Sequence, residues 1–246
     1  MSPSQDHLPT PWRRTPLIHS TTLSKSAGCE IYLKLENLQP SGSFKSRGIG
    51  NLLLSHLRSS DPSSRSKIHF YSSSGGNAGL ACVVAAVSLS APATIVVPLS
   101  TSSFMIGKLR DAGASDVIQE GTSWYEADHH LKTVVIAEAE KRGEKPVYVP
   151  PFDAPEIWDG NATITSEILE DLGQAPDAVV CSVGGGGLFS GIMQGREMAG
   201  EKARGLKVLA VETEGADSLN LSVKEGKLST LPAITSIATT LGARTF

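Results

Sequence analysis

Short apolar runs alternate with longer amphipathic segments along most of the chain. Within each run the apolar residues are mostly consecutive, and this pattern predicts strands that are buried on both faces, as in a parallel sheet. We expect strands at 31–35, 68–71, 94–97, 117–119, 147–149, 178–183 and 208–211.

The segments between these runs have the length and apolar spacing of helices. We expect helices at 46–58, 78–89, 103–112, 124–142, 162–172, 188–198 and 216–225. Because strands that alternate with helices form parallel sheets with right-handed crossovers, the predicted fold class is α/β. Ligands bind beyond the carboxyl ends of the strands in such sheets, so a site is expected in the strand-to-helix turns.

The first of these turns, residues 41–48, has the sequence SGSFKSRG and places Lys45 in the first turn of a helix. The amide dipoles there favour anions, so a lysine is poorly placed. Two interpretations stay open. Either Lys45 is a solvated surface residue, or its amine is held neutral, as Schiff-base chemistry requires.

The second turn, residues 72–79, has the sequence SSSGGNAG. Consecutive serines and glycines before a helix leave backbone N–H groups free to bind a carboxylate or a phosphate, with the Asn77 amide as a further donor. The same residue types also suit an ordinary short loop and helix cap.

The third turn, residues 182–188, has the sequence SVGGGGL. Ordering four successive glycines is entropically costly, so something must need the backbone itself at this place. The position of the glycines, after a buried strand and before a helix, favours a phosphate cup of main-chain N–H groups over a flexible loop. No Gly-Lys-Ser/Thr follows and the G-x-G-x-x-G spacing is absent, so this is neither a P-loop nor a dinucleotide fingerprint.

Composition narrows the class of protein. The 246 residues carry 22 Lys and Arg against 25 Asp and Glu, a net charge of -3 without basic clusters, so nucleic acid is not an expected partner. No apolar stretch reaches the ~20 residues of a membrane span. Cys29, Cys82 and Cys181 lack the spacing of a disulfide framework or a zinc site and are expected to be buried, reduced thiols of a cytoplasmic protein.

Two further segments contain residue types that are found in functional sites or at domain boundaries. The adjacent His129 and His130 cannot share one helix face, so we do not expect a metal site there. Residues 150–160 form a proline-rich break, either a crossing between domains or an ordinary structured loop.

Five motifs together resemble one family, the L-serine/L-threonine dehydratases among the fold-type II pyridoxal-phosphate (PLP) enzymes. They are PSGSFKSRG (40–48), SGGNAG (74–79), PPFD (150–153) followed by Ile157 and Trp158, SVGGGGL (182–188) and ITS (234–236). The resemblance implies two parallel-sheet domains with helices on both faces. Residues 1–42 and 151–246 would form the large domain and residues 43–150 the small one. Members of the family continue well beyond the position of Phe246, so the resemblance implies that the large domain is incomplete.

The resemblance also implies roles for individual residues. Lys45 would be the catalytic Schiff-base lysine, Phe44 would pack near the cofactor ring, and Asn77 would hydrogen-bond the ring hydroxyl. The substrate carboxylate would be held by Ser74, Gly75, Gly76, Asn77 and Ala78. The cofactor phosphate would be held by Gly184, Gly185, Gly186, Gly187 and Leu188. A monovalent cation such as K⁺ would lie at Gly184, Glu212, Ala216, Leu241 and Ala243.

The implied reaction is a β-elimination that converts L-serine to pyruvate and ammonia, and L-threonine to 2-oxobutanoate and ammonia. The resemblance implies a homodimer whose small-molecule substrate is an amino acid. A membrane is not an expected partner. Two alternatives stay open: a catalytically impaired, truncated homologue that binds PLP or a full-length partner, and a serine racemase of the same fold. Related racemases and threonine deaminases often carry His at the position of Ala78, which favours the dehydratase.

Overall fold

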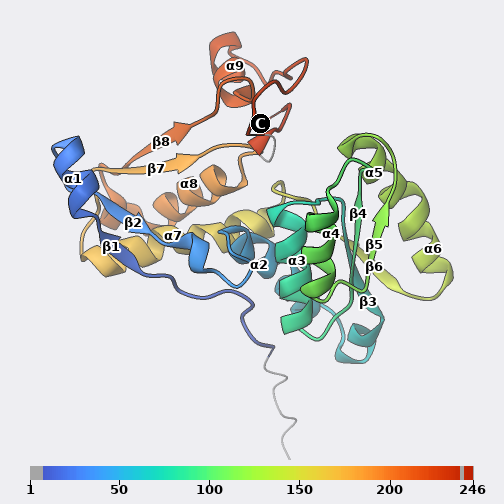
Figure 1. Cartoon of the computed structure of the whole chain (residues 1–246). Coiled ribbons are helices and arrows are strands. Elements are labelled where there is room, and N and C mark those ends of the chain that lie inside the picture. Colours follow the sequence, from blue (N-terminus) through green and yellow to red (C-terminus); the bar gives the residue numbers. More distant parts are fainter. Residues whose placement is uncertain (1–7, 239–240, 246) are drawn as a thin grey trace, which may run out of the picture. The chain divides into compact units, whose positions relative to one another are not determined.

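The computed structural model describes residues 8–238 and 241–245, and they form two compact units (Figure 1). The first unit contains residues 8–13 together with Lys45–Pro151, and the second contains Arg14–Phe44, residues 152–238 and residues 241–245. The sequence-based domain division grouped residues 1–42 with residues 151–246, whereas in the structure residues 8–13 lie with Lys45–Pro151. The reason is that Pro11 and Trp12 pack on Gly50, where an added Cβ would lie 2.9 Å from Pro11 Cγ.

The first unit is built on a four-stranded parallel sheet of order β5-β4-β3-β6. Its strands are β3 (Ile68–Ser72), β4 (Ala93–Val97), β5 (Asp116–Gln119) and β6 (Lys145–Tyr148). Every residue of β4 is buried, as the continuous apolar run predicts. The four apolar runs from residue 68 to residue 149 thus correctly predicted a parallel sheet.

Helices cover both faces of this sheet, with α3 and α4 on one side and α5 and α6 on the other (Figure 1). The helices of the unit are α2 (Lys45–Ser59), a 3-10 helix (Pro62–Lys67), α3 (Asn77–Ser88), α4 (Ser103–Asp111), α5 (Trp124–His130), a π-helix (Leu131–Val135) and α6 (Ile136–Lys141). The expected single helix 124–142 is therefore interrupted by a π-helical turn. Ala127, Leu131, Val135 and Ala139, at intervals of four residues, all lie in the core on this face.

The second unit begins with a feature that the apolar pattern did not predict. Strand β1 (Leu17–His19) pairs antiparallel with β2 (Tyr32–Lys34), and α1 (Thr21–Ala27) connects them. The run 31–35 is thus a strand, but it does not belong to a parallel sheet. Its residues are not buried on both faces, since Tyr32 is 44% and Leu33 is 36% exposed.

An ion pair anchors β2 to the longest helix of the unit, α7 (Pro155–Leu172). Lys34 Nζ lies 2.7 Å from Glu167 Oε2, and both side chains are largely buried. The same amine donates a hydrogen bond to the carbonyl of Thr15. Lys34 therefore fixes the small antiparallel sheet on α7.

The rest of the second unit holds a two-stranded parallel sheet of β7 (Ala178–Ser182) and β8 (Lys207–Val211). Its other elements are a 3-10 turn (Glu36–Leu38), α8 (Gly187–Ala199), a second 3-10 turn (Gly200–Ala203) and α9 (Ser218–Glu225). Helices α7 and α8 pack so closely at Gly191 that a Cβ added there would lie 2.4 Å from Asn161 Cβ.

Helix α7 starts earlier than expected. Residues 155–160 were assigned to a proline-rich break, but Pro155 is the first residue of the helix. Proline is favoured at that position because its φ suits a helix and no intrahelical acceptor exists there for an N–H group.

Cys29 also departs from expectation. Cys82 and Cys181 are buried, but Cys29 is exposed, and all three are free thiols. It follows Gly28, the cap of α1, and that helix buries none of its residues. Among the described residues, no helix is long and apolar enough to cross a bilayer.

Candidate active site

Lys45 is the first residue of α2, in the first helical turn where the sequence placed it. Its turn does not follow a strand of a parallel sheet, since β2 and a 3-10 turn precede it. The amine donates a hydrogen bond of 2.5 Å to the carbonyl of Pro151. Desolvation by burial lowers the pKa of Lys45 from 10.5 to about 8. The neutral, nucleophilic form of the amine is therefore half-populated near pH 8 instead of pH 10.5, and about a tenth of it is present at pH 7.

The turn 73–76 joins the end of β3 to the start of α3 at Asn77. The Ser72 hydroxyl donates to the carbonyl of Val149, and Gly76 N donates to Ser74 Oγ. A Cβ at Gly79 would lie 1.8 Å from the carbonyl oxygen of Ser74, so only glycine allows the helix to pass this close to the turn.

No side chain caps α3, whose N-cap is Gly76, and Asn77 is exposed. The first amides of a helix have no intrahelical acceptor. The turn therefore offers backbone donors and the Asn77 amide to an anion, as the sequence suggested for a carboxylate or phosphate.

The glycine loop 184–187 joins β7 to α8, and its structure explains the run of glycines in part. A Cβ at Gly185 would lie 2.3 Å from the Phe152 ring, and one at Gly187 would lie 2.6 Å from the Phe152 carbonyl oxygen. Gly186 has φ +81°, a left-handed conformation that favours glycine. It caps α8 without a side-chain hydrogen bond, so the first amides of α8 are also available to an anion.

The five residues expected around a cation are brought together only in part. The Gly184 backbone approaches Leu241, whose carbonyl oxygen would lie 2.8 Å from an added Cβ. Both carboxylate oxygens of Glu212 accept hydrogen bonds from backbone N–H groups of α9, those of Leu219 and Asn220. Glu212 thus acts as a cap of α9 in this structure. Ala216 is buried in the loop before α9, and Ala243 donates its N–H to the carbonyl of Leu241.

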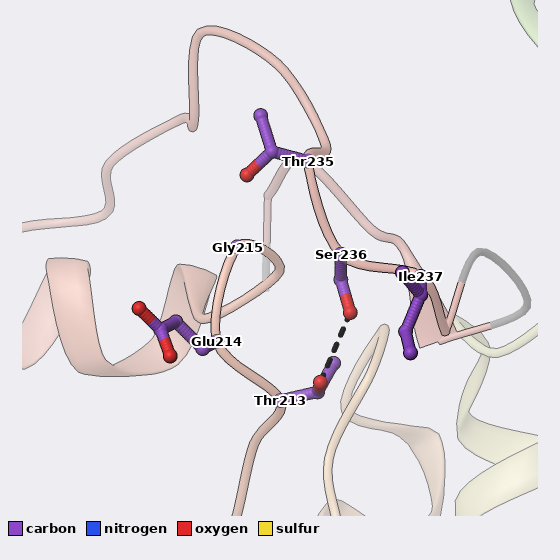
Figure 2. A pocket seen from close by; sticks show the side chains of 6 residues that line it. All are labelled: Thr213, Glu214, Gly215, Thr235, Ser236 and Ile237. Atoms are coloured by element: carbon purple, nitrogen blue, oxygen red, sulfur yellow. Dashed lines mark hydrogen bonds between the residues drawn. The ribbon is translucent and has the colours of Figure 1, made fainter.

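The ITS motif contacts the loop that follows β8, and the two segments line an open cavity of about 370 Å³ (Figure 2). The hydroxyls of Thr213 and Ser236 lie 3.0 Å apart across it. Thr235 N donates to the carbonyl of Gly215. The motif therefore holds the loop after β8 in place.

Sequence reasoning gave no role to three groups that shape these segments: the Pro151 carbonyl, the Phe152 ring and the Asp128 carboxylate. A carbonyl has no sequence signal of its own. The PPFD motif did point to the neighbourhood of Phe152. Asp128 lies in a helix with no motif, and only the folded structure shows that it accepts a hydrogen bond from Ser73.

The chain is similar to known proteins over almost its whole length. The family described as pyridoxal-phosphate dependent enzyme matches residues 8–246. An L-serine dehydratase of Saccharomyces cerevisiae is 44% identical over 240 residues, which cover 95% of this chain and 70% of the relative. The catabolic L-serine/threonine dehydratase of the same species is 45% identical over 238 residues, covering 94% and 65%. The bovine L-serine dehydratase/L-threonine deaminase is 45% identical over 231 residues, which cover 94% of this chain and 66% of the relative.

Solved structures show the same relationship. A fungal L-serine ammonia-lyase from Rhizomucor miehei superposes with a TM-score of 0.84 at 35% identity, covering 95% of this chain and 70% of that one. Threonine deaminase isoform 2 from Solanum lycopersicum superposes with a TM-score of 0.81 at 31% identity, covering 95% of this chain and 64% of that one. Maize serine racemase superposes with a TM-score of 0.80 at 27% identity, covering 94% of this chain and 66% of that one.

These matches confirm the predicted α/β fold and the resemblance to L-serine and L-threonine dehydratases that the five motifs carry. The chain spans between 65% and 70% of the length of the curated relatives named here. The chain belongs to the family of pyridoxal-phosphate dependent enzymes of fold type II.

Proposed function

We propose that this protein is an L-serine/L-threonine ammonia-lyase, which converts L-serine to pyruvate and ammonia, and L-threonine to 2-oxobutanoate and ammonia. The water that leaves the β-carbon is returned in the hydrolysis that releases ammonia, so ammonia is the only net loss. The observation that carries the proposal is the amine of Lys45, whose pKa burial lowers to about 8 in a chain of the PLP family. The substrates are supported by relatives named as serine and threonine dehydratases at 43–45% identity.

The residues present fit the cofactor. Lys45 supplies an amine that is partly neutral near neutral pH, which covalent attachment of an aldehyde requires. The uncapped start of α8 supplies main-chain N–H groups that suit a phosphate, at Gly184, Gly185, Gly186, Gly187 and Leu188. When bound, PLP withdraws electrons from the α-carbon of the amino acid joined to it.

The chain's own groups supply the remaining chemistry. The turn Ser74–Ala78 binds the substrate carboxylate through its amides and orients the α-carbon. Lys45, in its neutral form, takes the α-proton, and the Pro151 carbonyl holds the amine at the start of α2. Phe44 would pack near the cofactor ring, and Asn77 would donate a hydrogen bond to the ring hydroxyl. A K⁺ ion at Gly184 and Leu241, with Glu212, Ala216 and Ala243, would steady the end of the glycine loop.

We also propose a cytoplasmic homodimer with the large and small domains predicted from the sequence, apart from the segment before Arg14. The free thiols Cys82 and Cys181 are compatible with a reducing compartment.

Lys45→Ala tests the function, with Lys108→Ala on α4 as the matched control. The parent protein and the control are expected to show the visible absorption band of lysine-bound PLP and to release pyruvate from L-serine and 2-oxobutanoate from L-threonine. The Lys45→Ala protein is expected to lose both the band and the products, because it has no amine to carry the cofactor.

Three results would contradict the proposal. Absence of the band in the parent protein would show that the protein does not bind PLP through a lysine. A band without products would indicate an impaired homologue. D-Serine as the main product, found by chiral analysis, would indicate a racemase.

A further inference from the structure

A buried carboxylate lies next to the turn Ser74–Ala78 in the first unit. Asp128 of α5 is 7% exposed. Its Oδ1 accepts hydrogen bonds from Ser73 Oγ and from Tyr148 Oη, each of 2.7 Å. Its Oδ2 forms an ion pair of 2.7 Å with Lys132 Nζ. Both oxygens of the carboxylate are therefore engaged.

This carboxylate is ionised. Burial raises the pKa of Asp128, but hydrogen bonds from Lys132, Ser73 and Tyr148 outweigh burial and hold the pKa below its usual value. Burial and the neighbouring Asp128 raise the pKa of Tyr148, so the phenol stays protonated and donates a hydrogen bond to the carboxylate. Hydrogen bonds to an ionised acceptor are stronger than neutral ones, so this cluster is a firm anchor.

The two donors hold different segments of the proposed site. Ser73 follows the last residue of β3 and directly precedes the turn Ser74–Ala78. Tyr148 is the last residue of β6, and three residues later Pro151 accepts the hydrogen bond of Lys45. One carboxylate thus links the segment that holds the lysine to the turn proposed for the substrate.

The helix that carries Asp128 is shaped to keep it at this edge of the sheet. The core residues Ala127, Leu131, Val135 and Ala139 recur every four residues, a spacing that drifts around an ordinary helix of 3.6 residues per turn. The π-helical turn Leu131–Val135 is wider and offsets the drift. Lys132 lies within it, four residues after Asp128 and 4.3 Å above the Tyr148 ring.

We propose that Asp128 is a positioning residue of the active site, which fixes the substrate-carboxylate turn relative to the lysine by holding Ser73 and Tyr148. The proposal rests on the function proposed above. Asp128 does not touch substrate in this scheme and acts through the two hydroxyls.

Tyr148→Phe and Asp128→Asn test it, with Tyr71→Phe as the matched control. Tyr71 is the register partner of Tyr148 on β3, and its hydroxyl donates a similar hydrogen bond of 2.6 Å to Glu144. Both tyrosine variants therefore lose one phenol-to-carboxylate hydrogen bond, but only Tyr148 is linked to Asp128.

Two readouts are compared in each variant: the dissociation constant of L-serine, from spectral titration of PLP-loaded protein, and hydrogen exchange of amides 74–78 in cofactor-free protein. We expect serine binding to weaken about tenfold and these amides to exchange about tenfold faster in Tyr148→Phe and Asp128→Asn. PLP affinity should stay unchanged, and neither readout should move in Tyr71→Phe.

Equal effects in Tyr148→Phe and Tyr71→Phe, or a lower melting temperature with neither readout changed, would overturn the proposal and leave Asp128 a purely structural residue. If the parent protein forms no PLP band, the proposed function fails. The exchange measurement then still decides whether Asp128 anchors the turn.

Discussion

Lys45 makes the stability of the cofactor-free protein depend on pH in a predictable direction. Its pKa is about 8 in the folded chain, against 10.5 for an unperturbed lysine. Between these values the unfolded chain binds more protons than the folded one, so the free energy of unfolding rises with pH. The penalty for burying the charge is full below pH 8 and is relieved toward pH 10.5.

Lys45→Met removes this titration. The free energy of unfolding of the parent should therefore increase relative to that of Lys45→Met by up to about 3 kcal/mol between pH 8 and pH 10.5. Urea denaturation of both proteins across this range measures the difference, in which other titrating groups cancel. A difference that stays constant with pH would mean that the amine is not desolvated.

At the scale of elements, the glycine loop should tolerate no side chain at Gly185. Gly185→Ala places a methyl group against the Phe152 ring, 2.3 Å from its nearest atom, and this overpacking should lower the free energy of unfolding by about 1–3 kcal/mol. Gly107→Ala, in the middle of α4 with no atom near its added Cβ, is the control and should stabilise by about 0.5–1 kcal/mol. Denaturant midpoints compare the two. An unchanged midpoint in Gly185→Ala would show that the loop can move away from Phe152.

The apolar pattern predicted the elements where burial on both faces decides the sequence, as in β3 and β4. It predicted β2 as a strand but not its antiparallel pairing at the surface, because a surface strand can carry an apolar run when its polar residue, Lys34, turns inward to Glu167. It also missed the start of α7, because proline is typical both of a chain break and of the first helical position.

The same limit applies to the candidate site. The three turns could be located from the sequence because runs of glycine and serine before a helix, and a lysine in a first helical turn, are visible in the local sequence. The contacts of Asp128, Phe152 and the Pro151 carbonyl could not be predicted in this way, because they join residues far apart in the chain.

At the scale of the whole molecule, the sheet of β7 and β8 has an open face. Parallel sheets are normally covered on both faces. Here the register partners Val180 and Leu209 are 65% and 49% exposed, and Val211 nearby is 52% exposed. Exposed apolar patches lower solubility.

Replacing Val180 and Leu209 with Thr should therefore raise the concentration at which the isolated chain aggregates, with little loss of melting temperature. Threonine has the β-branched shape that strands prefer. Light scattering on concentration measures the effect. Val96→Thr, in the fully buried β4, is the contrast and should lower the melting temperature. Aggregation at the parent's concentration in the double variant would show that this face is not the cause.

The interleaving of the two units sets an order on folding during synthesis. A ribosome makes roughly 5–20 residues per second, from the N-terminus onward. Strands β1 and β2 are synthesised first, but Lys34 cannot form its hydrogen bond to Asp171 of α7 until a further 137 residues have been made. The inserted segment Lys45–Pro151 is by then entirely synthesised. The nascent chain can therefore fold this segment before the second unit is completely synthesised. The hydrogen bond between Lys45 and Pro151 holds the ends of the folded segment together, which lowers the entropy cost of closing the loop between the two halves of the second unit.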